Sequence, residues 1–313
     1  MRVRIFSLAI WGTLAILLPP AFGGCGKDPL QIATGIDGGG GQSSATAGAP
    51  AGTGGAAGAG GVTAVAPTCV ESSKYPGGQC SCNDSSCTCN KSTDSTSLRA
   101  CDFTCGSPSR PCTLTCPSGG CATTCAANTT CDVVCQGLGG SCDTRCETGA
   151  LCTMDCSRTG NCTMPCHGAT CTLVGCEGSC SLDCTGDKAA CRVRECGGGC
   201  TILNCAAGNQ CAIDSCGGGC VIRECGPGAT CEIGTCTAGC SINYCAAGST
   251  CVIDTCVGPG CTIQCAAGAT CTIRNCPSTG CFIGCQAGAT CKIENCNSTS
   301  TAACNQNATY TGP

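Results

Sequence analysis

Cysteine and isoleucine alternate with polar residues along the C-terminal half of the chain. The residue two positions after a cysteine is almost always isoleucine, as in the segment 200–205. Residues i and i+2 of a β-strand point to the same face, so the cysteine and its isoleucine point inward while the residues between them face water. A β-branched residue at a fixed inward position is typical of a strand, and no 3.6-residue period competes with it. The pattern predicts many short strands, with inward isoleucines at Ile202, Ile213, Ile222, Ile233, Ile242, Ile253, Ile263, Ile273, Ile283 and Ile293.

These strands recur with a period of 20 residues. Each unit holds two segments of the same kind, joined by a short glycine-rich turn and followed by a longer turn with a central glycine such as Gly208. Glycine at a corner supplies the positive φ that a tight bend needs. A fixed period of this length is typical of a solenoid. We therefore predict an all-β fold, a parallel β-solenoid with rungs of about 20 residues, marked by Cys191, Cys211, Cys231, Cys251, Cys271 and Cys291.

The N-terminal half repeats this design with three residues between cysteines, as in 112–116 and 152–156. The two cysteines and the residue midway between them would all face inward there, which is the simplest strand pattern. The four-residue spacing that dominates further on predicts a bulge or corner before the second cysteine. About ten units fit between Cys101 and Cys304, and at about 4.8 Å per rung they would stack to about 50 Å.

Composition explains why cysteine occupies the predicted core. Of the 313 residues, 47 are Cys and 49 are Gly, whereas only 11% are charged and 3% aromatic. Large apolar side chains are too few to order this much backbone, which excludes the core of an ordinary enzyme-sized globule. Disulfides take over that role in an oxidising compartment, whereas a cytosolic chain with so many thiols would bind metal.

Disulfides are predicted across the turns, so that each rung is ribbed. Cys196 would face Cys200 across a three-residue turn, at a Cα separation that a disulfide tolerates. For the other edge the sequence leaves two schemes open: Cys191 pairs with Cys205, or Cys205 pairs forward with Cys211. Each short loop contributes about 2 kcal/mol of stability when it is closed. The structural disulfide candidates of two consecutive rungs are Cys191, Cys196, Cys200, Cys205, Cys211, Cys216, Cys220 and Cys225.

The first 24 residues have the pattern of an export signal. Arg2 and Arg4 precede an apolar run at 5–18 that is too short to span a bilayer, and Pro19 and Pro20 end it. We predict that residues 1–24 are a cleaved signal peptide.

Residues 21–25, with the sequence Ala-Phe-Gly-Gly-Cys, resemble the lipobox of bacterial lipoproteins, although Phe22 stands where that motif usually has leucine. The resemblance implies that Cys25 is acylated and becomes the new N-terminus, so that lipid chains hold the protein on the membrane. Gly26 in place of aspartate implies sorting to the outer membrane of the bacterial cell envelope. The alternative is plain secretion, with Cys25 as one more disulfide partner.

Composition divides the mature chain into four parts. Residues 25–68 are rich in Gly, Ala, Ser and Thr, and we predict a disordered, flexible linker with a reach of about 30 Å. Residues 69–100 break the repeat and would form an irregular Cys-rich cap at the N-terminal end of the solenoid. Residues 101–304 hold the repeats, and residues 305–313 form a C-terminal tail.

Units such as Thr170-Cys-Thr172 and Thr270-Cys-Thr272 resemble the repeats of the disulfide-ribbed β-helical antifreeze proteins of insects. In that family two aligned ranks of outward threonine form a flat ice-binding face. Here the rank after the cysteine is interrupted by charges of both signs, and the family's 12-residue period is absent. The resemblance therefore implies the architecture, whereas ice binding is the least favoured function. The rank that survives, before the cysteine, consists of Thr170, Thr230, Thr250, Thr270 and Thr290.

Catalytic chemistry lacks its usual components in this sequence. His167 is the single histidine, and the sequence shows no Ser-His pairing and no second histidine. The residues needed for a Ser-His-Asp triad or a histidine-rich zinc site are therefore missing. We expect no enzyme activity and no cofactor. Charged residues recur at one outward position of successive rungs, where opposite charges would form a stabilising ladder. That ladder would pair Arg194 with Asp214, and Asp254 with Arg274 and Glu294.

Metal binding is the main alternative to a structural role. Cys80-Ser-Cys82 and Cys87-Thr-Cys89 resemble the Cys-X-Cys clusters of metallothioneins, and thiolates select soft metals. The export signal favours disulfides instead, because thiols outside the cytoplasm oxidise. Nucleic acid is not an expected partner: without Arg2 and Arg4, the 15 basic residues fall to 13 against 19 acidic ones.

The sequence thus predicts a non-catalytic, lipid-anchored surface module with a structural or adhesive role. Its partners would be the membrane, through the lipid on Cys25, and a surface polysaccharide or protein, because solenoids present long faces suited to such contacts. The alternatives are an extracytoplasmic thiol-rich metal-binding protein and, less favoured, an ice-surface binder.

Overall fold

The computed structural model describes residues 66–71, 73, 78–90, 100–107, 110–117, 119–137, 141–277, 280–295 and 309–311. The predicted signal peptide, Cys25 and residues 25–65 of the predicted linker lie outside the described residues. By its internal contacts the chain divides into Met1–Ala59 and Gly60–Pro313, and every described residue belongs to the second unit. None of the described segments is a helix long and apolar enough to cross a membrane.

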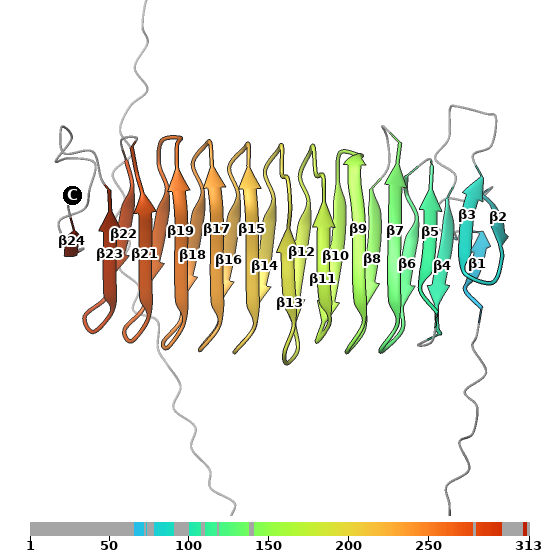
Figure 1. The fold of residues 1–313 in the computed structure, drawn as a ribbon, viewed down its shortest axis with the longest axis horizontal. Helices are drawn as coiled ribbons and strands as arrows, with labels where there is room; N and C mark the ends of the chain where they lie inside the picture. Colours follow the sequence, from blue (N-terminus) through green and yellow to red (C-terminus); the bar gives the residue numbers. More distant parts are fainter. Residues whose placement is uncertain are drawn as a thin grey trace, which may run out of the picture. The chain divides into compact units, whose positions relative to one another are not determined.

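Two β-sheets make up the described part of the chain, and Figure 1 shows the strands of each sheet side by side. The first sheet, which we call sheet A, has 11 strands. They are β1 (Thr68–Glu71), β4 (Cys101–Cys105), β6 (Ala122–Cys125), β8 (Cys142–Cys146), β10 (Cys162–His167), β12 (Ser181–Thr185), β14 (Thr201–Cys205), β16 (Val221–Cys225), β18 (Ser241–Cys245), β20 (Thr262–Cys265) and β22 (Phe282–Cys285).

The second sheet, sheet B, has 13 strands. They are β2 (Gln79–Cys82), β3 (Ser86–Asn90), β5 (Cys112–Cys116), β7 (Thr130–Gln136), β9 (Leu151–Arg158), β11 (Thr170–Val174), β13 (Ala190–Val193), β15 (Gln210–Cys216), β17 (Thr230–Cys236), β19 (Thr250–Cys256), β21 (Thr270–Asn275), β23 (Thr290–Glu294) and β24 (Thr309–Thr311).

From β3 to β23, successive strands alternate between the two sheets, so each rung contributes one strand to each. Neighbouring strands from β4 to β22 and from β5 to β23 are parallel, and their register advances by 20 residues in the C-terminal half, as where Cys211 lies beside Cys231. The ten strands from β4 to β22 correspond to about nine turns. The predicted parallel β-solenoid with rungs of about 20 residues is therefore confirmed.

The core consists of one row of mostly large apolar side chains from each sheet, with cysteines on both sides. In β15 the residues alternate between inward and outward up to Asp214, with Cys211 and Ile213 almost completely buried. The N-terminal rungs place leucine, methionine or valine where the later rungs have isoleucine. The largest fully buried side chains are Phe103, Leu114, Met154, Met164, Leu173, Leu182, Ile202, Ile213, Ile222, Ile233, Ile242 and Ile253.

The four-residue spacing between cysteines produces the predicted bulge. In β14 both Leu203 and Asn204 face outward before Cys205 turns back into the core. The pairing of β12 with β14 shifts register at this point, because the spacing in β12 is one residue shorter. A second shift occurs where β18 meets β20. Each bulge puts two adjacent side chains on the outer face of sheet A.

The N-terminal end differs from the regular rungs. β1 pairs antiparallel with β4, and β2 and β3 form an antiparallel hairpin before β3 joins β5 in parallel. At the other end, β24 adds in parallel to β23. Strands of different direction at the first rung interrupt the repeating ladder and limit further strand addition there.

Glycine is required at the longer turns because of its backbone conformation. Gly208, Gly228, Gly248, Gly268 and Gly288 all have positive φ, which side chains with a Cβ rarely adopt. At Gly248 an added Cβ would meet only the Gly228 nitrogen, at 3.7 Å, so backbone strain is the main cost of a larger residue there.

We expect Gly248→Ala to lower the free energy of unfolding by about 1 kcal/mol, the cost of a left-handed conformation for an L-residue. The matched control is Gly106→Ala, because a Cβ at Gly106 has no neighbour within 4 Å and its φ is not positive. Guanidinium unfolding without reductant, followed by circular dichroism, measures both variants. Equal midpoints for the two variants would contradict the expected strain.

Candidate binding surface and disulfide edges

Disulfides close both edges of the solenoid by joining the two sheets across the turns, whereas Cys82–Cys87 lies within the hairpin of β2 and β3. The described residues contain 22 disulfides, which pair all 44 described cysteines of the 47 in the chain. The remaining three, Cys25, Cys296 and Cys304, lie outside the described residues. Pairing on this scale indicates an oxidising, extracytoplasmic compartment.

The structure contains one of the two schemes that the sequence leaves open. Cys196 pairs with Cys200, and Cys205 pairs forward with Cys211, with Cα separations of 6.2 and 6.1 Å. The alternative bond between Cys191 and Cys205 is absent, because the coil has advanced by one rung when Cys205 reaches that edge. Cys191 pairs backward with Cys184 instead. The same arrangement joins the other candidates as Cys216–Cys220 and Cys225–Cys231.

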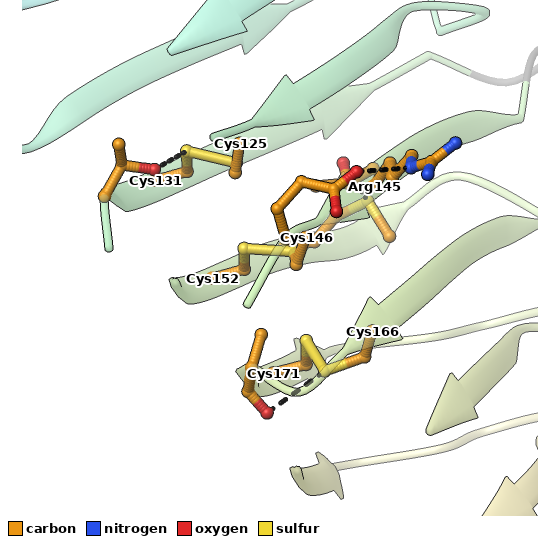
Figure 2. Close-up of a disulfide and its surroundings, with 12 residues drawn as sticks. Cys125, Cys131, Arg145, Cys146, Cys152, Cys166 and Cys171 are labelled. Atoms are coloured by element: carbon orange, nitrogen blue, oxygen red, sulfur yellow. Dashed lines mark hydrogen bonds and ion pairs between the residues drawn. A yellow bond between two sulfur atoms is a disulfide. The ribbon is translucent and has the colours of Figure 1, made fainter. Parts of the chain in front are cut away.

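The disulfides of successive rungs stack at the edges. Figure 2 shows three of them, which close three successive turns at one edge. The Sγ atoms of Cys125, Cys146 and Cys152 lie within 4.8 Å of one another, so sulfurs of adjacent rungs come close without being bonded. The three disulfides are Cys125–Cys131, Cys146–Cys152 and Cys166–Cys171.

The cysteines that resemble a metallothionein cluster are oxidised in the structure. Cys80 is bonded to Cys69, Cys82 to Cys87, and Cys89 to Cys101. A sulfur in a disulfide has no thiolate to offer a soft metal. This pairing favours a structural role for these cysteines over metal storage.

A hollow of about 730 Å³ lies on the outer face of sheet B. Its floor is formed by small side chains on adjacent strands, including Ala190 and Ala212. In the register of sheet B, Ala212 lies between Arg192 and Glu232. Because the side chain of Ala212 is only a methyl group, it leaves a gap between the cation and the anion. The other polar groups that line the hollow are Thr170, Thr172, Arg194, Gln210, Asp214 and Thr230.

Two charged residues that line this hollow, Arg192 and Asp214, form an ion pair, and Glu232 lines the same hollow. The Arg192 Nε donates to both carboxylate oxygens of Asp214 at 2.8 Å. This hydrogen bond and the charge of Asp214 raise the pKa of Arg192, and Glu232 adds to the effect. The pair is half exposed, so it contributes at most about 1 kcal/mol to stability.

The predicted partner of Asp214 was Arg194, and this prediction is wrong. The pairing of β13 with β15 ends at Val193, and Glu195 has a positive φ of 46°. Arg194 therefore leaves the ladder before it can lie beside Asp214.

The second predicted ladder forms only in part. Arg274 Nη1 donates to Asp254 Oδ1 at 2.9 Å, as expected, and this contact raises the pKa of Arg274. Glu294 forms its ion pair with Lys292 on its own strand, and its charge also raises the pKa of Arg274 on the adjacent strand.

A second hollow, of about 530 Å³, lies on the outer face of sheet A. Its residues are the outward pairs created by the bulges: Leu203 and Asn204 from β14, Arg223 and Glu224 from β16, and Tyr244 from β18. Tyr244 is 47% exposed, and it is one of the few aromatic residues of the chain. An aromatic ring among amide, guanidinium and carboxylate groups suits a ligand that combines apolar faces with hydroxyls.

The prediction from the sequence does not include this hollow, because its residues come from three segments of successive rungs. One feature of the sequence could have indicated the hollow. The position before the second cysteine of alternate segments is occupied in turn by Asn204, Glu224 and Tyr244. Asn204 is held in place by a hydrogen bond from its Nδ2 to Asp183 Oδ1, at 2.8 Å.

Two other sequence features have simple structural surroundings. His167 Nδ1 lies 2.7 Å from the Thr185 hydroxyl on the adjacent strand. The threonine rank is in register along sheet B at Thr230, Thr250, Thr270 and Thr290, whereas the rank two residues further on reads Glu232, Val252, Thr272 and Lys292.

Comparison with known proteins gave no match to any family model, to any curated protein or to any solved structure.

Proposed function

We propose that this protein is a non-catalytic adhesive module of the bacterial outer membrane, held by lipid on Cys25, and that its solenoid binds a surface polysaccharide. The observation that carries the binding role is the sheet A hollow, where half-exposed Tyr244 lies among Asn204, Arg223 and Glu224. Sugar rings present C–H faces that pack on an aromatic ring and hydroxyls that hydrogen-bond to amide and charged groups.

The disulfide-ribbed scaffold supports this role because it holds the binding groups on strands. A site on strands keeps its geometry without the ligand, which reduces the entropy lost on binding. The outward pairs occur on three successive strands, β14, β16 and β18, so a polymer could contact all three along sheet A.

The non-catalytic part of the proposal rests on the surroundings of the titratable groups. Among the residues that the structure describes, the buried polar side chains are hydroxyls and one amide, namely Ser107, Thr123, Thr129, Thr144, Thr159, Asn209 and Ser249. None of the carboxylate or cationic side chains in the described residues is among these buried side chains. General acid–base catalysis usually needs a group whose pKa burial has shifted.

We expect Tyr244→Ala to weaken polysaccharide binding by about tenfold, because the stacking surface is lost. The test measures retention of the purified full-length lipoprotein in detergent on immobilised neutral glucan and polyuronate. The matched control is Phe282→Ala, which removes another exposed aromatic of sheet A that does not line the hollow. Retention on neither polymer, or equal retention of Tyr244→Ala and the wild type, would contradict the proposal.

A further inference from the structure

Four cysteines at the N-terminal end of the solenoid lie where a second disulfide pairing can form. The structure contains Cys69–Cys80 and Cys89–Cys101, with Cα separations of 5.8 and 5.7 Å. The Sγ atoms of Cys69, Cys80 and Cys101 all lie within 4.8 Å of one another. A thiolate released on Cys69 would therefore lie next to the sulfur of a neighbouring disulfide, which is the arrangement that thiol–disulfide exchange requires.

Strand pairing holds Cys69 near Cys101 without help from either bond. In the antiparallel ladder of β1 and β4, Cys69 lies opposite Phe103 and Glu71 lies opposite Cys101. Cys69 and Cys101 are therefore diagonal neighbours on the same face of sheet A.

The hairpin of β2 and β3 does the same for the other two cysteines. Cys80 lies directly opposite Cys89, and Cys82 lies directly opposite Cys87. The two pairs are two residues apart along each strand, so they occupy the same kind of position in the antiparallel ladder. Cys82 and Cys87 are themselves bonded, with a Cα separation of 4.1 Å. A Cys80–Cys89 bond would repeat a linkage that this hairpin already contains.

The outer pair of sulfurs is open to a small reagent and the inner pair is not. Cys69 and Cys80 are half-buried, whereas Cys89 and Cys101 are at most 1% exposed. β1 and β2 are also the outermost strands of their sheets, so each has a neighbour in its sheet on one side only. The exchange requires β1 to shift until the Sγ atoms of Cys69 and Cys101, which start within 4.8 Å of each other, reach bonding distance.

We propose that Cys69, Cys80, Cys89 and Cys101 form a thiol-exchange site that takes a small thiol and switches between two pairings. The thiolate of the small thiol attacks Sγ of Cys80, which forms a mixed disulfide and releases the Cys69 thiolate. Cys69 then attacks Cys101, which forms the Cys69–Cys101 bond and releases the Cys89 thiolate. Cys89 attacks Cys80, which forms the Cys80–Cys89 bond and returns the small thiol. Two disulfides are present before and after, so there is no net oxidation or reduction.

The exchange changes how the two sheets are joined. In the structure, Cys69–Cys80 joins β1 of sheet A to β2 of sheet B, and Cys89–Cys101 joins β3 of sheet B to β4 of sheet A. After the exchange each bond lies within a single sheet. The first rung thereby loses both covalent links between the sheets, and the next link towards the C-terminus is Cys105–Cys112.

The test treats the purified mature protein with a small amount of reduced glutathione, quenches with acid, blocks free thiols and digests with trypsin without reduction. Cleavage after Lys74 and Lys91 yields peptide 75–91, which carries four of the cysteines. In the starting pairing this peptide stays linked to the peptides of Cys69 and Cys101. We expect glutathione to release it with two internal disulfides, and to link Cys69 to Cys101. The proposal is overturned if the peptide stays attached to both, or is released only with glutathione or blocking groups on its cysteines.

A single substitution tests the same exchange without any added thiol. In Cys69→Ser the free thiolate of Cys80 faces Cys89, so we expect the free thiol to move to Cys101 and to be labelled there after denaturation. The matched control is Cys82→Ser. Among the described cysteines, Cys82 and Cys87 belong to no such close group of three sulfurs, so the free thiol should stay on Cys87. A label that remains on Cys80 in Cys69→Ser would overturn the proposal, whatever the wild type shows.

Discussion

Full reduction of the protein under native conditions is expected to unfold the solenoid and to abolish its β-sheet circular dichroism. Most strands of the regular rungs bury one large apolar residue between two cysteines, as Ile213 is buried between Cys211 and Cys216. The bonds close loops of four to seven residues over most of the solenoid, and each contributes about 2 kcal/mol. Because a folded domain is stable by only about 5–15 kcal/mol, the loss of a few of the 22 bonds is enough to unfold it.

Two measurements on the same samples check this expectation. Intact mass after alkylation gives the number of free thiols, and circular dichroism gives the remaining β structure. Without reductant, the 44 paired cysteines should take up no alkyl groups. Uptake of several groups before reduction, or an unchanged spectrum after all of these cysteines have been alkylated, would contradict the structural role of the disulfides.

The repeat itself could be predicted from the sequence because it depends on local geometry alone. A strand puts residues i and i+2 on the same face, so the position of Ile202 two residues after Cys200 determines which face is inward. The bulge before Cys205 follows from the same count, since a fourth intervening residue cannot keep both cysteines inward in a regular strand.

Disulfide partners and ion pairs could not be predicted in full because they depend on how far the chain advances in each turn. Cys205 has candidate partners before and after it in the sequence, and the pitch of the coil selects Cys211. Arg194 and Asp214 occupy equivalent positions of successive units, but the strand of Arg194 ends at Val193. The position in the repeat therefore gives the face of a side chain but not its neighbour.

The sheet A hollow could not be predicted from one segment, because it combines residues of three successive rungs. Asn204, Glu224 and Tyr244 are 20 residues apart, and nothing in any one segment marks a binding residue. Register brings Asn204 beside Glu224, and the hollow also includes Tyr244 from the next strand. Candidate sites on a solenoid are thus columns of the repeat, so the residues at one repeat position have to be compared along the sheet.

Cys25→Ser is expected to abolish the mature, lipid-bearing form of the protein in the membrane fraction. We propose that the thiol of Cys25 carries the lipid, and serine has no thiol for the first acylation. Processing of the signal depends on that modified cysteine, so the variant should keep the mass of residues 1–24. The measurement is cell fractionation followed by intact mass of the product. An inhibitor of lipoprotein signal processing should produce the same increase in mass in the wild type.

The control separates the loss of lipid from the loss of a cysteine. Cys285→Ser also removes a cysteine, one that pairs with Cys291 at the C-terminal end of the solenoid, and it should remain in the membrane fraction with its signal removed. A single acyl chain gives only reversible binding, so full retention depends on the several chains that a lipoprotein cysteine carries. If Cys25→Ser remained membrane-bound with the wild-type mass, Cys25 would be an ordinary cysteine of a secreted protein. The adhesive module would then act in solution rather than on the cell surface.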